Sequence, residues 1–97
     1  MSPLNRKKLN TIRKKLDKLD NELLKVIKKR SLLVNNVIKL KTNRSEIVDK
    51  KRIKSILKKI KFKSIQNKID PIITKKIWTS MIWSYINFEK KNFKKKK

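Results

Sequence analysis

Three cations in the N-terminal half of the chain are spaced so that they could hold a small anion. Arg30 interrupts a series of apolar residues three and four positions apart, where another leucine is expected on the buried face of a helix. Lys41 follows eleven residues later, within ~20° of the same face and ~16 Å along the helix. Arg13 lies ~40 Å of helix from Lys41, farther than one small ligand can span. If all three serve one site, Arg13 must come from a second, antiparallel copy of the helix.

One carboxyl near the C-terminus is also unusually placed. Glu89 is the only acid after Asp70, and it continues a helical line that contains Ile82 and Tyr85. A carboxyl on an apolar face tends to stay protonated and can then donate a hydrogen bond. At the surface, the same residue would simply pair with a neighbouring lysine. The pattern alone fits both interpretations.

The composition limits the chemistry that these residues can support. The chain contains no Cys and no His, which removes thiolate metal sites, most zinc chemistry and most nucleophilic dyads. Arg binds a carboxylate through two parallel hydrogen bonds, whereas Lys acts as a point charge. We therefore expect a pocket for a compact dianion, with no metal and no cofactor, that works by orientation and electrostatic stabilisation. Taken singly, Arg30 and Lys41 are also explained as ordinary solvent-facing helix residues.

Apolar periodicity and capping signals predict an all-α chain with three helices. Ser2-Pro3 and Asp70-Pro71 are each typical of a helix start, and Asp49 can cap the helix between them. The third helix carries apolar side chains almost all round, so we expect it to be buried on several sides. The predicted segments are a helix at 5–41, a loop at 42–48, a helix at 49–61, a connection at 62–69, a helix at 71–92 and a basic tail at 93–97, expected to be disordered from Lys94.

The first predicted helix carries a nearly continuous apolar line. This spacing is typical of a helix that packs against other helices. A chain of 97 residues is near the lower limit for one self-sufficient core, so oligomerisation would help to stabilise it. We call this line the apolar seam; it comprises Leu9, Ile12, Leu16, Leu19, Leu23, Val26, Leu33, Val37 and Leu40.

The net charge of +24 has two interpretations. Clustered Lys and Arg ordinarily favour binding to nucleic acid, and a non-enzymatic basic helical module remains an alternative. However, the excess is almost all Lys, spread through every segment together with Ile and Asn, while Gly and Ala are absent. Lys, Asn and Ile have AT-rich codons, so we interpret the charge mainly as the mark of an AT-rich genome. Nucleic acid is then expected to bind only weakly and non-specifically.

The sequence shows no sign of membrane insertion or export. No apolar run reaches the length of a membrane span, and the N-terminus lacks the apolar core of a secretory signal. We therefore expect a cytoplasmic protein.

Three segments together carry a resemblance to a known family. They resemble the all-helical chorismate mutases, and the similarity extends over residues 9–91. The spacing of Arg13, Arg30 and Lys41 is the specific part of this resemblance. The segments are RxxLDxLDxxLLxxIxxR from Arg13 to Arg30, followed by Lys41; IVDxxR from Ile47 to Arg52; and DPxI continuing to IWxxMIxxYIxxE, from Asp70 to Glu89.

The resemblance implies an intertwined homodimer of three-helix chains that catalyses the Claisen rearrangement of chorismate to prephenate, without a cofactor, in phenylalanine and tyrosine biosynthesis. Arg30 would hold one substrate carboxylate and the partner subunit's Arg13 the other, while Lys41 and Glu89 flank the ether oxygen. The implied catalytic residues are Arg30, Lys41 and Glu89; the implied substrate-binding residues are Arg13, Arg30, Lys41, Asp49, Arg52, Tyr85 and Glu89; no metal ligand is implied.

This role for Glu89 requires a proton. An ether oxygen only accepts hydrogen bonds, so Glu89 must be protonated to contact it productively. We therefore expect activity to fall as the pH rises, and Glu89→Gln to flatten that profile.

Ile53 departs from the pattern of many chorismate mutases, which carry Glu after the arginine corresponding to Arg52. An apolar residue there resembles isochorismate pyruvate-lyases as well as a subgroup of mutases, and the segment from Trp78 to Ile82 also fits the lyases. Lyase activity is therefore an alternative function. Asp49 and Arg52 remain to contact a hydroxyl or carboxylate, although capping alone also explains Asp49.

Overall fold

The structure, a computed structural model, describes residues 1–94, and these residues contain three α-helices, one short 3₁₀ turn and no strand. The predicted all-α class with three helices is confirmed. Residues 95–97 of the predicted basic tail lie outside the described range. None of the helices within residues 1–94 has the length and hydropathy needed to cross a membrane. The elements are α1 (Pro3–Leu40), η1 (Arg44–Glu46), α2 (Lys50–Gln66) and α3 (Pro71–Asn92).

The chain divides into two compact units, and the first, Met1–Leu33, consists of α1 alone. A single helix has no second element in its own unit against which to bury an apolar face. Accordingly, Leu16, Leu19 and Leu23 of the apolar seam are 52%, 58% and 55% exposed. Helices in water derive most of their stability from packing of such a face. The first unit by itself therefore leaves most of the apolar seam exposed.

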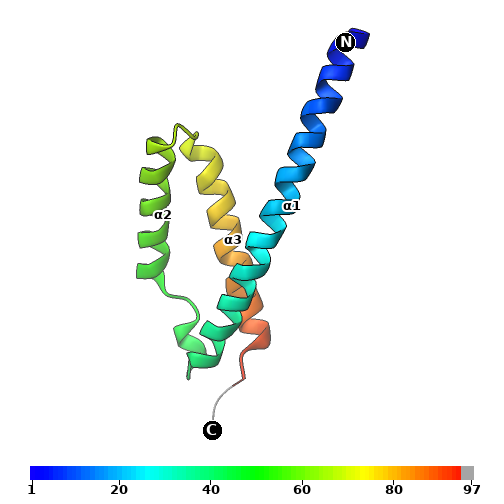
Figure 1. Cartoon of the computed structure of the whole chain (residues 1–97). Helices are drawn as coiled ribbons and strands as arrows, with labels where there is room; N and C mark the ends of the chain where they lie inside the picture. Colours follow the sequence, from blue (N-terminus) through cyan, green and yellow to red (C-terminus); the bar gives the residue numbers. More distant parts are fainter. Residues whose placement is uncertain (95–97) are drawn as a thin grey trace. The chain divides into compact units, whose positions relative to one another are not determined.

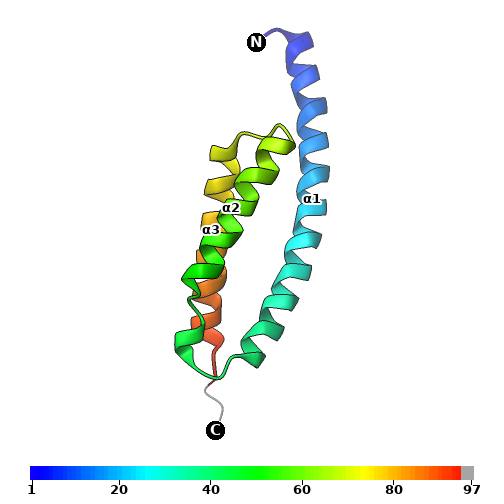
Figure 2. The same ribbon diagram turned by 90° about the vertical axis from the view of Figure 1, so that its left-hand side faces the viewer.

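The second unit, which begins at Val34, contains the apolar core of the chain. Its helices α2 and α3 pack as an antiparallel pair joined by a short connection (Figure 1), and the same pair is seen from the side in Figure 2. Three buried residues, Ile47, Ile82 and Ile86, form the centre of the core. The half-buried residues packed around them are Val48, Ile53, Ile56, Leu57 and Phe93.

Helix α2 begins as predicted and ends later than predicted. The Asp49 side chain caps it by accepting a hydrogen bond from the amide of Arg52 at 2.9 Å. The helix continues to Gln66 instead of stopping near residue 61. The prediction placed the end too early because no Gly marks the residue after the helix. Lys68 adopts a left-handed conformation with φ 57°, and the residue in such a position after a helix is usually Gly. The chain contains no Gly, so Lys takes this position at a steric cost of about 1–2 kcal/mol.

A buried polar contact joins the last turn of α2 to the first turn of α3. The hydroxyls of Ser64 and Thr74 lie 2.7 Å apart, and the Ser64 hydroxyl also donates to the carbonyl of Ile60 at 2.6 Å. Ser64 and Thr74 are 3% and 8% exposed. Because both hydroxyls find partners, their burial carries little penalty. This contact fixes how far along α3 the end of α2 packs.

Helix α3 spans the predicted residues, but it is not buried on several sides. The Asp70 side chain caps it by accepting from the amide of Ile72 at 2.9 Å. In the single chain, its buried residues are Thr74, Ile82, Ile86 and Glu89. In the single chain the expected burial on several sides is not seen, because within its unit α3 packs against α2 and the adjoining loop. The large apolar residues that stay exposed are Ile72, Ile73, Ile77, Trp83 and Phe88.

Candidate active site

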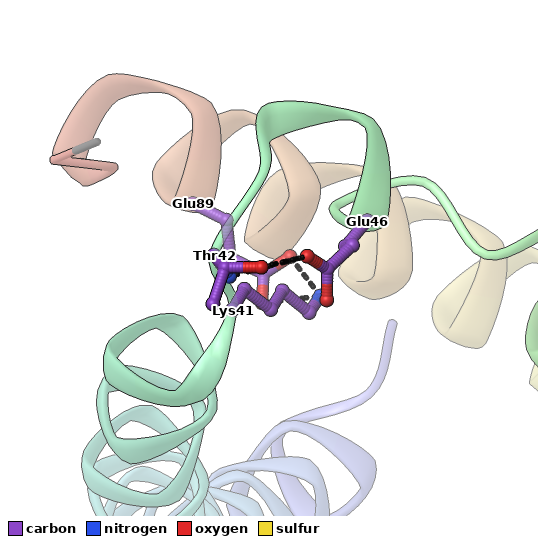
Figure 3. Close-up of polar contacts among 4 residues, drawn as sticks. All are labelled: Lys41, Thr42, Glu46 and Glu89. Carbon is purple, nitrogen blue, oxygen red and sulfur yellow. Dashed lines mark hydrogen bonds and ion pairs between the residues drawn. The ribbon is translucent and has the colours of Figure 1, made fainter. Parts of the chain in front are cut away.

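Lys41 and Glu89 form a largely buried ion pair between residues 48 positions apart in the sequence. The Lys41 ammonium nitrogen lies 3.3 Å from Glu89 Oε1 and 3.4 Å from Oε2 (Figure 3). The side chains are 19% and 8% exposed, respectively. Each charge offsets the desolvation of the other, so removing either one would leave a buried charge without compensation.

The periodicity of α3 explains why Glu89 points inward. Glu89 follows Ile82 and Ile86 at helical spacing, so all three lie on one face. The two isoleucines pack around Ile47 in the core, and Glu89 extends the same face toward the C-terminal end of the helix. Lys41 is the first residue after α1, and its amide still bonds to the carbonyl of Val37 at 3.3 Å. The site thus joins the end of α1 to the last turns of α3.

The Lys41 ammonium of the pair suits an acceptor atom that gains negative charge. Two polar groups 3.3 Å apart can both contact a third atom at ordinary hydrogen-bond distance, about 3 Å. The ammonium has three N–H donors, so it can serve Glu89 and a ligand together. Donors fixed in a largely buried position stabilise developing charge without having to reorganise. Residues 1–94 contain no cluster of acidic, His or Cys side chains that could hold a metal ion.

A tight turn follows Lys41, where only a loop is predicted from the sequence. Glu46 Oε1 accepts hydrogen bonds from the Thr42 hydroxyl at 2.7 Å (Figure 3) and the Thr42 amide at 3.2 Å. It also accepts from the Asn43 amide at 2.9 Å. The Thr42 hydroxyl, followed by the Asn43 amide, lowers the pKa of Glu46 below its usual value, and the positive charge of Lys41 adds to this effect. The spacing of Asn43 and Glu46 matches a capping box, a signal that could have revealed the turn.

A model of the chorismate mutase type II family matches residues 12–90. The match covers most of the chain and includes Lys41 and Glu89. The chain belongs to the chorismate mutase type II family. This confirms the resemblance drawn from the sequence, and it assigns the chain to a family of isomerases. No curated protein and no solved structure gave a significant match.

Two further residues expected in the mutase site lie at the start of α2. Asp49 lines the same open surface depression as Lys41 and Glu46, and its carboxylate is occupied as the cap of α2. Arg52 lies in the first turn of α2 and is exposed. The structure therefore brings Asp49 and Lys41 to one depression.

Tyr85 and Ile53 are both half-buried in the second unit. Tyr85 precedes Glu89 by about one helical turn on α3 and shares its face. Ile53 packs against the core formed with Ile82 and Ile86. At the position where many mutases carry Glu, this chain therefore presents an apolar side chain.

The remaining residues expected in the site, Arg13 and Arg30, belong to the first unit. Both are exposed on α1, which is unbroken between them, so ~26 Å of helix separates their backbones. Within the second unit, by contrast, the side chains of Lys41 and Glu89 are in contact. The predicted site residues thus fall into two groups, one in each unit.

Proposed function

We propose that this chain catalyses the rearrangement of chorismate to prephenate, a step toward phenylalanine and tyrosine. The observation that carries the proposal is the buried contact between Lys41 and Glu89 in a chain of the chorismate mutase type II family. The reaction is unimolecular: one C–O bond breaks while one C–C bond forms. No proton or electron is exchanged with the protein, so neither a nucleophile nor a cofactor is needed.

Lys41 and Glu89 act on the ether oxygen. As its bond to carbon breaks, this oxygen gains negative charge in the transition state. The Lys41 ammonium donates a hydrogen bond to it, and this bond strengthens as the charge develops. Glu89 accepts from Lys41 in the free protein, so it must take up a proton before it can donate a second bond to the same oxygen. The distance of 3.3 Å between the two groups allows both to reach one oxygen.

Arginines hold the two carboxylates of the substrate. Arg30 binds one and the partner subunit's Arg13 binds the other, each able to form two parallel hydrogen bonds. The second subunit is required because Arg13 lies too far along its own helix to share a small ligand with Lys41. The exposed apolar seam supports this arrangement, since a second copy of α1 would cover it.

The test is a spectrophotometric assay of the purified protein with chorismate. We expect chorismate to disappear and prephenate to form, with kcat/KM reduced at least ~10²-fold in Arg30→Ala because a bidentate carboxylate contact is lost. Lys28→Ala, which removes an exposed cation of the same helix outside the proposed site, is the control and should retain the wild-type rate. Absence of turnover by a folded protein would refute the proposed function.

The apolar character of Ile53 supports one alternative substrate. Without a carboxylate at this position, the site has one fewer acceptor for a substrate hydroxyl, and isochorismate is a dianion of similar shape. The same assay with isochorismate separates the two functions. Release of pyruvate from isochorismate at a higher kcat/KM than chorismate turnover would replace the mutase proposal by isochorismate pyruvate-lyase activity.

A further inference from the structure

The position of Lys41 poses a structural problem. Its backbone lies just beyond the end of α1, where helical hydrogen bonds run out. Its side chain is long and flexible and loses considerable rotamer freedom when it is held in one place. The ammonium nevertheless lies on Glu89 of a different helix. The residues that follow Lys41 must therefore fix its backbone.

Glu46 provides the first constraint. Its Oε1 accepts three hydrogen bonds, two from Thr42 and one from the Asn43 amide, so the chain immediately after Lys41 is folded back on this carboxylate. The 3₁₀ bond from the Glu46 amide to the Asn43 carbonyl, at 3.1 Å, closes the same turn from the other side. The next residue, Ile47, is 3% exposed in the core. The turn is thus anchored at its C-terminal end by burial.

Arg44 provides the second constraint, by tying the turn to α3. Its guanidinium donates to the carbonyl of Lys90 at 3.1 Å and lies 5.7 Å from the centre of the Phe93 ring, within the range of a cation–π contact. Lys90 belongs to the last turn of α3, whose carbonyls have no partner within the helix. Since Lys90 is the neighbour of Glu89, this bond fixes the turn beside the carboxylate that Lys41 contacts.

We propose that Glu46 and Arg44 are positioning residues that hold the Lys41 ammonium against Glu89. Neither residue contacts the substrate. Glu46 sets the direction in which the chain leaves α1, and Arg44 sets the distance between the turn and the end of α3. The inference rests on the proposed function, because it assigns these residues to the alignment of the donors at the ether oxygen.

The kinetic test uses Glu46→Ala and Arg44→Ala. Because a misplaced donor weakens transition-state contacts more than substrate binding, we expect kcat to fall at least ~10-fold in each variant. KM should change much less. Glu46→Gln keeps an acceptor for the turn and should recover most of the rate. Lys54→Ala, which removes an exposed cation of α2 outside this depression, should behave as wild type. An unchanged kcat in both alanine variants, or a rise in KM alone, would overturn the proposal.

A spectroscopic test does not depend on turnover. The side-chain ¹⁵N and ¹³Cε signals of Lys41, assigned with Lys41→Arg, should shift on Glu89→Gln in an otherwise wild-type chain. In Glu46→Ala, whose overall fold is checked by circular dichroism, that response should largely disappear. A full response in both Glu46→Ala and Arg44→Ala would disprove positioning. If the response behaves as expected but chorismate is not converted, the proposed function fails while the positioning of the pair stands.

Discussion

The two units of the chain hold their predicted site residues in opposite ways. In the second unit, Lys41 is fixed by an ion pair with Glu89 and by a hydrogen-bonded turn. In the first unit, Arg13 and Arg30 lie on a helix that has no second element of its own unit. Within one chain, only the second unit brings predicted site residues into contact. Under the proposed function, the arginines of the first unit are ordered by assembly with a second chain.

The largest effect is expected from disrupting the apolar seam. Leu23→Glu places a charge at the centre of the seam, so the dimer should dissociate and kcat/KM should fall at least ~10²-fold because no second chain supplies Arg13. Analytical ultracentrifugation and the chorismate assay measure the two consequences. Asn21→Glu introduces the same charge ~200° away around the helix and is the control. An active monomeric Leu23→Glu protein would show that one chain suffices.

A mixing experiment tests whether the arginines of one site come from different chains. Arg13→Ala and Arg30→Ala should each lose at least ~10²-fold in kcat/KM as separate homodimers. In a mixed dimer, one site receives both intact arginines and the other receives neither. After subunit exchange at equal concentrations, about a quarter of the wild-type activity should therefore return. If both arginines of a site belonged to one chain, mixing would restore nothing.

The pH profile tests the second unit by itself. If Glu89 donates to the ether oxygen, Glu89→Gln, whose amide carries a donor at every pH, should lose less activity at alkaline pH than the wild type does. Glu89→Ala is the matched control and should be slower by ~10²-fold at every pH. The measurement is kcat/KM for chorismate across the pH range. An identical alkaline decline in Glu89→Gln would exclude this role for the carboxyl.

The smallest effect concerns the turn after Lys41. Hydrogen bonds from Thr42 and Asn43 lower the pKa of Glu46 from its ordinary value of 4.5. The carboxylate therefore stabilises the folded state above about pH 4.5, and this contribution is lost as the pH falls through the lowered pKa. The stability difference between wild type and Glu46→Gln, from urea unfolding, should shrink on acidification. Glu22→Gln controls for the loss of one negative charge, and an equal change in that control would contradict the prediction.

Much of the architecture could be predicted from local signals. The caps Asp49 and Asp70 were visible because an N-cap is specified by one side chain and the residues next to it. The end of α2 could not be predicted in this way, because Lys68 occupies the left-handed position where Gly usually signals the end of a helix. The limited burial of α3 could not be predicted either, since apolar residues all round a helix do not indicate which faces the chain itself covers.

For the site, too, local signals could be predicted from the sequence and contacts between distant segments could not. The apolar face of α3 placed Glu89 among buried residues, as the helical line with Ile82 had suggested. The contact between Glu89 and Lys41 depends on how distant segments pack, which residue spacing alone cannot specify. The turn at Glu46 combines a local capping signal with a tertiary bond from Arg44 to α3. The sequence carries the capping signal of Asn43 and Glu46, but it does not indicate the hydrogen bond from Arg44 to α3.

The hydroxyl pair between Ser64 and Thr74 has a consequence for the order of folding. The last turn of α2 is followed by Lys68 in a sterically unfavourable conformation, so local preferences alone do little to stabilise the turn. The hydrogen bond between Ser64 and Thr74 stabilises this turn only after α2 and α3 have packed together. The end of α2 should therefore become ordered late, together with the docking of α3, and the loop between them should close as part of that same step.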